Sequence, residues 1–198
     1  MNDRTALILE EFLGPQELAW LWSFAMNRSY DFAPSQVIND VEAGVHNDDF
    51  RRSIVLYDLD GFHERISARI MHYLPHVLQR LQHAPFQVSS IEAQLTASND
   101  GEFFKPHVDC GQGPVATREI TFVYFCHREP QAFSGGELKL YDSGPALPER
   151  PEPYLSIRPT QNTMVFFRAD RLHEISTVSC PSRAFPDSRF TLNGWLHR

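Results

Sequence analysis

The second half of this sequence contains four side chains whose types suit a metal site that also binds a small acid. His107 and Asp109 stand two residues apart in FKPHVDCG, His173 lies in RLHEISTV, and Arg189 begins RFTLNGW. Two imidazoles and one carboxylate are mixed nitrogen and oxygen ligands that suit Fe(II), and three protein ligands leave coordination positions open. A chelating 2-oxo acid and O2 could take those positions, while a guanidinium binds a further carboxylate through two hydrogen bonds. We predict that His107, Asp109 and His173 bind the metal and that Arg189 binds the acid.

Spacing alone does not single out His107 and Asp109, because His46 and Asp48 have the same spacing. In a strand, residues two apart point to the same side, so His107 and Asp109 would project together while Val108 packs behind them. The second pair lies in a stretch rich in Asp, Asn and Gly that has no strand pattern. We expect this stretch to be a solvated loop rather than a metal site.

The third metal ligand and the arginine each have rivals elsewhere in the sequence. His173 follows the apolar run MVFF and opens the next predicted strand, whereas His127 and His197 lie at a turn and at the chain end. Arg189 begins the final predicted strand, where a guanidinium inside the fold would need a charged partner. Arg183 lies between two prolines in a segment unsuited to a central strand, so we expect a solvent-facing ion pair for it. If that segment were a strand, Arg183 would become the anchor.

Length and composition favour one compact domain over residues 1–198. The chain is 42% hydrophobic and 12% aromatic, which is enough for one sizeable core. Its net charge of -7 and the lack of any run of Lys or Arg disfavour nucleic acid as a partner. No apolar stretch reaches the roughly 18 residues of a membrane span, and no leader pattern begins the chain, so we expect no membrane partner. Three cysteines at scattered spacing favour a reducing compartment, and we expect a cytoplasmic protein.

The pattern of apolar residues predicts two helices followed by many short strands. The first helix follows Gly14-Pro15, and after a loop over about residues 31–50 a second helix begins near Asp60. Pro75 is expected to kink or split this second helix. From residue 86 onward, strand-like runs are separated by Gly, Pro and Asp. They cover residues 86–97, 119–126, 137–141, 154–157, 163–167, 173–178 and 189–196.

These elements predict a mainly β (α+β) fold, in which a two-sheet jelly roll is covered on its outer face by the helices. Residues 1–85 would form the helical support and a loop, and residues 86–198 would form the roll. Two Pro-rich stretches, 142–153 and 180–188, are interpreted as surface loops near the mouth of the roll. One of them could serve as a lid over the site.

Five blocks, in order, resemble the 2-oxoglutarate and Fe(II)-dependent dioxygenases, specifically their prolyl-hydroxylase-like branch. The blocks are NDGEFFKPHVD, REITFVYF, SGGELKLYD, VFFRADRLHEISTV and RFTLNGW, and the resemblance covers about residues 90–195. It implies a double-stranded β-helix in which His107, Asp109 and His173 bind Fe(II) and Arg189 binds the carboxylate of the cosubstrate 2-oxoglutarate. Ascorbate is the candidate reductant.

The same resemblance implies that the protein uses O2 and 2-oxoglutarate to hydroxylate an unactivated C–H bond, with release of succinate and CO2. A prolyl or other amino-acid side chain, free or in a peptide, is the expected target. Two alternatives remain: an oxygenase of an unrelated small biosynthetic metabolite, and a non-catalytic module that binds metal and 2-oxoglutarate. A closed pocket would indicate the first alternative, because a protein substrate needs an open groove.

Two positions depart from the family pattern. Related proteins often have a tyrosine at the start of the NDG block and another in the strand after REIT, where the phenols help to hold 2-oxoglutarate. Here Ser98 stands at the first position and Phe125 at the second. The neighbouring Tyr124 would point to the opposite face, because side chains alternate along a strand. The residues that replace these two phenols are therefore not identified by the sequence.

Overall fold

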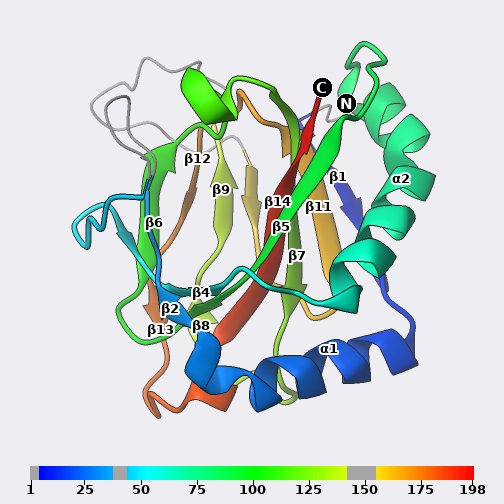
Figure 1. Ribbon diagram of the computed structural model, residues 1–198. Coiled ribbons are helices and arrows are strands. Elements are labelled where there is room, and N and C mark those ends of the chain that lie inside the picture. The colour runs from blue at the N-terminus through cyan, green and yellow to red at the C-terminus, as the bar shows by residue number, and fades with distance from the viewer. Residues whose placement is uncertain (1–4, 38–43, 142–154) are drawn as a thin grey trace.

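Two antiparallel sheets face each other in the computed structural model, which describes residues 5–37, 44–141 and 155–198 (Figure 1). The larger sheet has seven strands, in the order β1 (Leu7–Leu9), β11 (Thr163–Arg168), β7 (Arg118–Cys126), β14 (Arg189–His197), β5 (Ser90–Ser98), β4 (Ile54–Leu56) and β2 (Ala33–Pro34). The smaller sheet has five, in the order β10 (Leu155–Ile157), β9 (Leu138–Leu140), β12 (His173–Ile175), β6 (Phe103–His107) and β3 (Arg51–Arg52). A third pair joins β13 (Val178–Ser179) to β8 (Ser134–Gly135).

Two helices, α1 (Pro15–Asn27) and α2 (Gly61–Leu81), cover the outer face of the seven-stranded sheet, as predicted (Figure 1). Helix α1 begins at the expected proline, whose missing N–H costs nothing in the first turn. Three short 3-10 helices lie in the connections, at Ser29–Asp31, Gly113–Val115 and Phe185–Asp187. None of the helices in the described part of the chain is long and apolar enough to cross a membrane.

Helix α2 differs from the prediction at Pro75, because the helix continues through this residue to Leu81 without a break. Pro75 lies on the exposed side of α2, where water can satisfy the carbonyl that loses its hydrogen bond. The opposite side is a continuous apolar stripe that packs on the sheet, formed by Phe62, Ile66, Ile70, Leu74, Val77, Leu78 and Leu81. Burial of this stripe therefore outweighs the single bond lost at the proline.

The two faces of the seven-stranded sheet contact different partners. Its outer face joins the helices in one large apolar cluster, to which β14 contributes Phe190, Leu192 and Leu196. Its inner face turns towards the five-stranded sheet. There a smaller apolar cluster, which includes Phe125 and Phe167, fills only part of the space between the sheets. Another part of that space is a cavity with many polar side chains in its lining.

The predicted strands all occur, but the sequence pattern missed several others. Residues before 86 supply β1, β2, β3 and β4, so the first part of the chain belongs to both sheets rather than serving only as helical support. The predicted run 173–178 is interrupted between β12 and β13. The short strands β2, β3 and β8 contain only two residues each, which is too short for an alternating pattern to be recognised.

The predicted surface loop 180–188 lies at the opposite end of the roll from the metal-site residues. The main-chain N–H of Cys180 donates to Asp100, which follows the end of β5, whereas His107 is at the far end of β6. This segment is therefore not placed to cover the metal site from its mouth. The other predicted loop, 142–153, lies outside the described residues.

Candidate functional site

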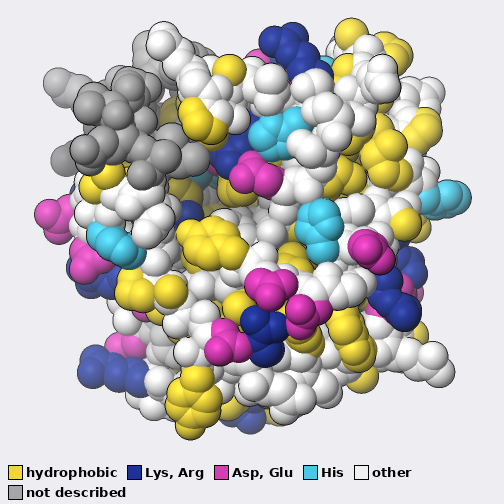
Figure 2. All heavy atoms as spheres, viewed as in Figure 1, with side chains coloured by type: hydrophobic (Ala, Val, Ile, Leu, Met, Phe, Trp, Pro, Cys, Tyr) yellow, Lys and Arg dark blue, Asp and Glu magenta, His cyan; other side chains and the backbone are white. Residues whose placement is uncertain are grey.

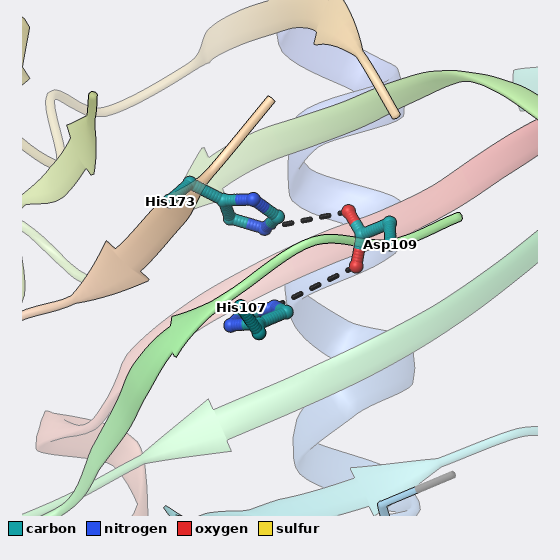
Figure 3. Close-up of side chains that lie close together, drawn as sticks. All are labelled: His107, Asp109 and His173. Carbon is teal, nitrogen blue, oxygen red and sulfur yellow. Dashed lines mark ion pairs between the residues drawn. The ribbon is translucent and has the colours of Figure 1, made fainter. Parts of the chain in front are cut away.

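The structure brings His107, Asp109 and His173 together between the two sheets. Each offers one ligand atom, and these atoms lie within 4.8 Å of one another. The Nε2 atom of His107 is 3.5 Å from Oδ1 of Asp109, and Nε2 of His173 is 3.3 Å from Oδ2 (Figure 3). Asp109 and His173 are buried, and His107 is partly buried. This cluster has the ligand types and the closeness that a metal site requires.

Two main-chain carbonyl oxygens orient the imidazoles. The Nδ1 atom of His107 lies 2.8 Å from the carbonyl oxygen of Lys105, and Nδ1 of His173 lies 2.9 Å from that of Arg171. Because a carbonyl can only accept, each Nδ1 must carry the proton and donate. Both Nε2 lone pairs are therefore directed at the shared centre, which is the arrangement found around histidines that bind metals.

Strand pairing places the two histidines side by side. His107 ends β6 and His173 begins β12, and the two residues are directly opposite in the antiparallel pair. Their ring centroids are 4.1 Å apart. Phe104 stacks on the His107 ring at 3.5 Å between centroids, which restrains the orientation of this ring.

Asp109 reaches the site differently from the prediction. Strand β6 ends at His107, so Asp109 lies in the bend that follows and not in the strand. The main-chain N–H groups of Asp109 and Cys110 both donate to the carbonyl oxygen of Ala169, at 2.9 and 3.2 Å. This anchor, rather than strand alternation, turns the carboxylate towards the histidines.

The electrostatic environment keeps Asp109 ionised and His173 neutral. Burial disfavours a charge on Asp109, but His173, His107 and a hydrogen bond from Thr121 (2.7 Å) together hold the pKa of its carboxyl well below the usual range. Burial is the main reason that the pKa of His173 is lowered to about 4. A carboxylate and a neutral imidazole are the protonation states that bind a metal cation.

Arg189 lies in the same cavity and has no carboxylate partner among the described residues. Its side chain is 2% exposed, its Nε donates to the carbonyl oxygen of Gly136 at 2.7 Å, and its Nη2 has no hydrogen-bond partner. The guanidinium carbon is 5.1 Å from the centre of the Phe125 ring. Burial lowers the pKa of Arg189 to about 10, yet the group remains charged at neutral pH. A buried cation with an unused donor is suited to a bound anion.

A single cavity, which we call the inner cavity, connects Arg189 with the three candidate ligands. Its walls come from both sheets, and many of its lining groups are polar. The lining residues are Arg51, Ser53, Gln94, Thr96, Ser98, Phe103, Phe104, His107, Asp109, Thr121, Val123, His173, Ile175, Arg189, Thr191, Asn193 and Trp195. A small diacid could thus reach from the arginine to the metal position.

The rival residues lie elsewhere. Arg183 is in a turn with its side chain 79% exposed and pairs with Asp100 at 3.1 Å, as predicted. His46 is exposed, and its Nδ1 lies 3.1 Å from the carbonyl oxygen of Ser35. His127 and His197 are buried outside the cluster; His197 contacts Glu92 at 3.0 Å.

The two departures from the family pattern fall where alternation predicted. Ser98 lines the inner cavity directly opposite Arg189 in the strand pair. Phe125 lies under the guanidinium, whereas the hydroxyl of Tyr124 donates to Asn162 at 2.8 Å within the helix-facing cluster. Among the described residues no phenol lines the inner cavity, and the side-chain hydroxyls there belong to serine and threonine.

Sequence analysis missed Thr121 and Gly136. Thr121 could have been found, because alternation in REITFVYF places it on the same side as Phe125. Gly136 could not, since its role follows from close packing: a Cβ there would lie 2.4 Å from Cδ of Arg189. The glycine makes room for the arginine to bend onto its carbonyl oxygen.

Comparison with known proteins identifies the family. The model of the 2OG-Fe(II) oxygenase superfamily matches residues 93–197, and the chain belongs to this superfamily. Its cofactors are therefore Fe(II) and 2-oxoglutarate. The buried ligand cluster and the unpartnered Nη2 of Arg189 fit those groups.

Two curated relatives share sequence with this chain. An uncharacterized PKHD-type hydroxylase of Synechocystis sp. is 36% identical over 195 residues, which cover 96% of this chain and 62% of the relative. A prolyl 3,4-dihydroxylase of Ostreococcus tauri is 29% identical over 98 residues, which cover 46% of this chain and 18% of the relative. The chain thus spans only part of the length of these relatives.

Solved structures confirm the double-stranded β-helix. A Pseudomonas putida prolyl-4-hydroxylase aligns with a TM-score of 0.66 and 16% identity, covering 98% of this chain and 92% of that one. A Trichoplax adhaerens prolyl hydroxylase, in complex with a hypoxia inducible factor peptide fragment, aligns with a TM-score of 0.68 and 16% identity, covering 99% and 84%. At such identities the likeness concerns the fold alone.

Proposed function

We propose that this protein is a dioxygenase that uses Fe(II) and 2-oxoglutarate to hydroxylate an unactivated C–H bond, with release of succinate and CO2. His107, Asp109 and His173 would bind the iron, and Arg189 would bind the distal carboxylate of 2-oxoglutarate. The bound iron and cosubstrate supply the oxidising chemistry, with O2 as the oxidant. The protein orients these groups and limits the access of water.

The observation that carries the proposal is the pairing of two features in one cavity. The three candidate ligands gather their free Nε2 and carboxylate atoms at one end, and the buried guanidinium of Arg189 presents an unused donor elsewhere in the same cavity. A metal site alone would fit many functions. A buried cation that lacks a carboxylate partner costs folding free energy, and a diacid bound across the cavity would offset that cost.

We further propose a prolyl or other amino-acid side chain as the target. Support comes from the relatives named above, which are called prolyl or PKHD-type hydroxylases, and from a fold neighbour that binds a peptide. The three cysteines Cys110, Cys126 and Cys180 are free thiols, which supports a reducing, cytoplasmic location.

An anaerobic titration with Fe(II) and 2-oxoglutarate tests the proposed cofactor site. We expect the visible charge-transfer absorption of the iron chelate to appear in the wild type, to be lost in His173→Ala and to be weakened in Arg189→Ala. Arg183→Ala is the matched control, because this arginine is exposed and already paired. Absorption that is weakened only by Arg183→Ala would move the anchor to that residue.

Activity is tested separately by mixing the loaded protein with air and measuring succinate. Proline-containing peptides and free amino acids are then screened for the gain of one oxygen by mass spectrometry. Absence of any succinate above a metal-free control would contradict the oxygenase activity and leave a binding module. Oxygen gain only on a non-amino-acid metabolite would contradict the proposed target class.

A further inference from the structure

A second cavity, which we call the outer cavity, meets the inner cavity at the candidate metal ligands. Its lining also includes Gln36, Val37, Gly44 and Phe50. None of these four residues is buried, so the cavity opens towards the protein surface. The residues that line both cavities are Arg51, Gln94, Phe104, His107, Asp109 and Trp195. If the inner cavity holds the cosubstrate, a substrate must approach the metal through the outer one. These shared residues therefore lie where a substrate would come nearest to the candidate metal ligands.

Arg51 is the cation at this junction. It lies in the edge strand β3, opposite Phe104 of β6, and its guanidinium carbon is 4.9 Å from the centre of the Phe104 ring. The candidate ligand His107 also stacks on that ring, at 3.5 Å between centroids. The guanidinium and a candidate metal ligand therefore contact the same aromatic ring.

The hydrogen bonds of Arg51 involve only neutral acceptors. Its Nε donates to Oγ of Ser53 at 3.3 Å and its Nη1 to the carbonyl oxygen of Gln36 at 3.2 Å. Within the described residues it makes no ion pair, and burial lowers its pKa to about 10. A partly buried guanidinium normally has a carboxylate or phosphate partner, because desolvation of the charge is otherwise uncompensated.

Several other arginines of the described residues form ion pairs. Arg118, which also lines the outer cavity, lies 2.7 Å from Glu92, and Arg28 pairs with several aspartates on the surface. Figure 2 shows the same tendency, since most basic side chains on the face viewed lie beside acidic ones. Asp109 is the remaining carboxylate of both cavities, and the proposed iron site uses it. Of the described cations that line the outer cavity, Arg51 is thus the one left for an external ligand.

Two further donors that line both cavities have no hydrogen-bond partner in the described residues. The side-chain nitrogens of Gln94 (Nε2) and Trp195 (Nε1) are buried and without a hydrogen-bond partner in the described part of the protein. Both belong to the inner face of the larger sheet, on the adjacent strands β5 and β14. Together with Arg51, these groups give the junction of the two cavities several hydrogen-bond donors, which favours a ligand rich in acceptor oxygens.

We infer that the outer cavity recognises a carboxylate of the substrate, with Arg51 as its ion-pair partner. This inference rests on the proposed function and narrows its substrate class to molecules with a carboxylate close to the hydroxylated carbon. The carboxylate can belong to a free amino acid or to an acidic side chain next to the target residue in a peptide. The amide of Gln94 and the indole N–H of Trp195 would add hydrogen bonds to the same group.

The test compares acids with matched amides that lack the charge. Protein is loaded anaerobically with Mn(II) and saturating 2-oxoglutarate, and calorimetry measures the binding of L-proline against L-prolinamide, and of acetyl-Pro-Asp-amide against acetyl-Pro-Asn-amide. We expect an acid of at least one pair to bind roughly tenfold or more tightly than its amide, as for a hydrogen-bonded ion pair. The pair that discriminates identifies the source of the carboxylate. Equal binding within both pairs, including no binding by any probe, would overturn the inference.

Two variants assign the preference to a residue. Arg51→Gln should remove the advantage of the acid, while Arg52→Gln should keep it, because Arg52 is exposed and lines neither cavity. An advantage that survives in Arg51→Gln would overturn the inference. So would an equal loss of 2-oxoglutarate affinity in that variant, since Arg51 would then belong to the cosubstrate site.

Failure of the proposed function has a different signature. Binding of 2-oxoglutarate that depends on Mn(II) is measured first in the same samples. If it is absent, the proposed function is contradicted and the inference falls with it. If it is present but no acid is preferred, only the inference fails.

Discussion

The two faces of the seven-stranded sheet use the same strands for opposite purposes. On β14, the outward residues Phe190, Leu192 and Leu196 are fully buried under the helices, while Arg189 and the inward residues after it line the cavity. The outer face is apolar and closely packed. The inner face carries polar groups with unused donors. The comparison indicates that stability comes mainly from the helix side and function from the other side, one residue apart along the chain.

The unused donors have an energetic consequence. Buried polar groups without partners destabilise a fold, so a protein retains them where a ligand will satisfy them. Among the described residues, the unpartnered buried groups that line the inner cavity include Nη2 of Arg189, Nε2 of Gln94 and Nε1 of Trp195. The apolar contacts of the outer face offset this cost in the free protein. Substitutions on the two faces should therefore separate stability from cofactor binding.

The largest effect is expected for Asp109→Ala. Loss of the only carboxylate in the ligand cluster removes most of the charge that would bind the metal, so succinate formation should fall by roughly a thousandfold or more. The matched control is Asp48→Ala, in the other His-x-Asp sequence, which should retain activity. Wild-type rates in Asp109→Ala would refute the assignment of the ligands.

Leu192→Ala tests the outer face on the same strand. Leu192 is fully buried in the helix-facing cluster, and its truncation should lower the free energy of unfolding by about 3 kcal/mol. Urea denaturation measures this loss, and calorimetry measures the affinity for 2-oxoglutarate below the transition. We expect that affinity to stay at the wild-type value. A parallel loss of binding would mean that the two faces are coupled.

Arg189→Met tests the inner face, where we expect an effect on ligand binding rather than on stability. Loss of the guanidinium should weaken binding of 2-oxoglutarate by about a hundredfold, because a buried bidentate ion pair cannot form. Stability without ligand should change by less than about 1 kcal/mol, since removal of a buried cation offsets the lost bond to Gly136. A large fall in stability with unchanged binding would assign Arg189 a structural role.

The smallest effect is expected for Thr121→Val, which removes one hydroxyl and keeps the shape of the side chain. The hydroxyl donates to Oδ2 of Asp109 and helps to keep the pKa of that carboxyl low. Affinity for Mn(II), measured by competition with a chelator, should fall by roughly ten- to a hundredfold, as for other groups that orient a metal ligand. Thr191→Val is the matched control, because Thr191 lines the cavity without touching Asp109.

Much of the site could be predicted because its residues carry chemistry that ordinary packing does not require. His107, Asp109, His173 and Arg189 were selected by type and context, and the structure brings the first three together and places the fourth in the same cavity. Arg183 forms the predicted solvent-facing ion pair, because its segment, which contains two prolines, is an exposed turn outside the sheets. Assigning roles to these residues remains a proposal that the experiments above test.

Other features could not be predicted because they depend on contacts between distant segments. Asp109 lies beyond the end of β6, and its orientation comes from Ala169, sixty residues later. The strand β3, which positions Arg51, is only two residues long, and it forms because β6 offers it an edge. Helix α2 passes through Pro75 because the apolar stripe on its other side is buried. Local propensity contains none of this information.

The sequence by itself therefore determined the family, the succession of strands in the roll and the residue types of the candidate site. Alternation along each strand was enough to separate Tyr124 from Phe125 and to put Arg189 inside. The tertiary structure alone decided that two cavities meet at the ligand cluster and that Arg51 lies between them without a carboxylate partner in the described residues. The physical reason is that periodicity is a property of one segment, whereas a cavity and its unsatisfied donors arise only where several segments pack together.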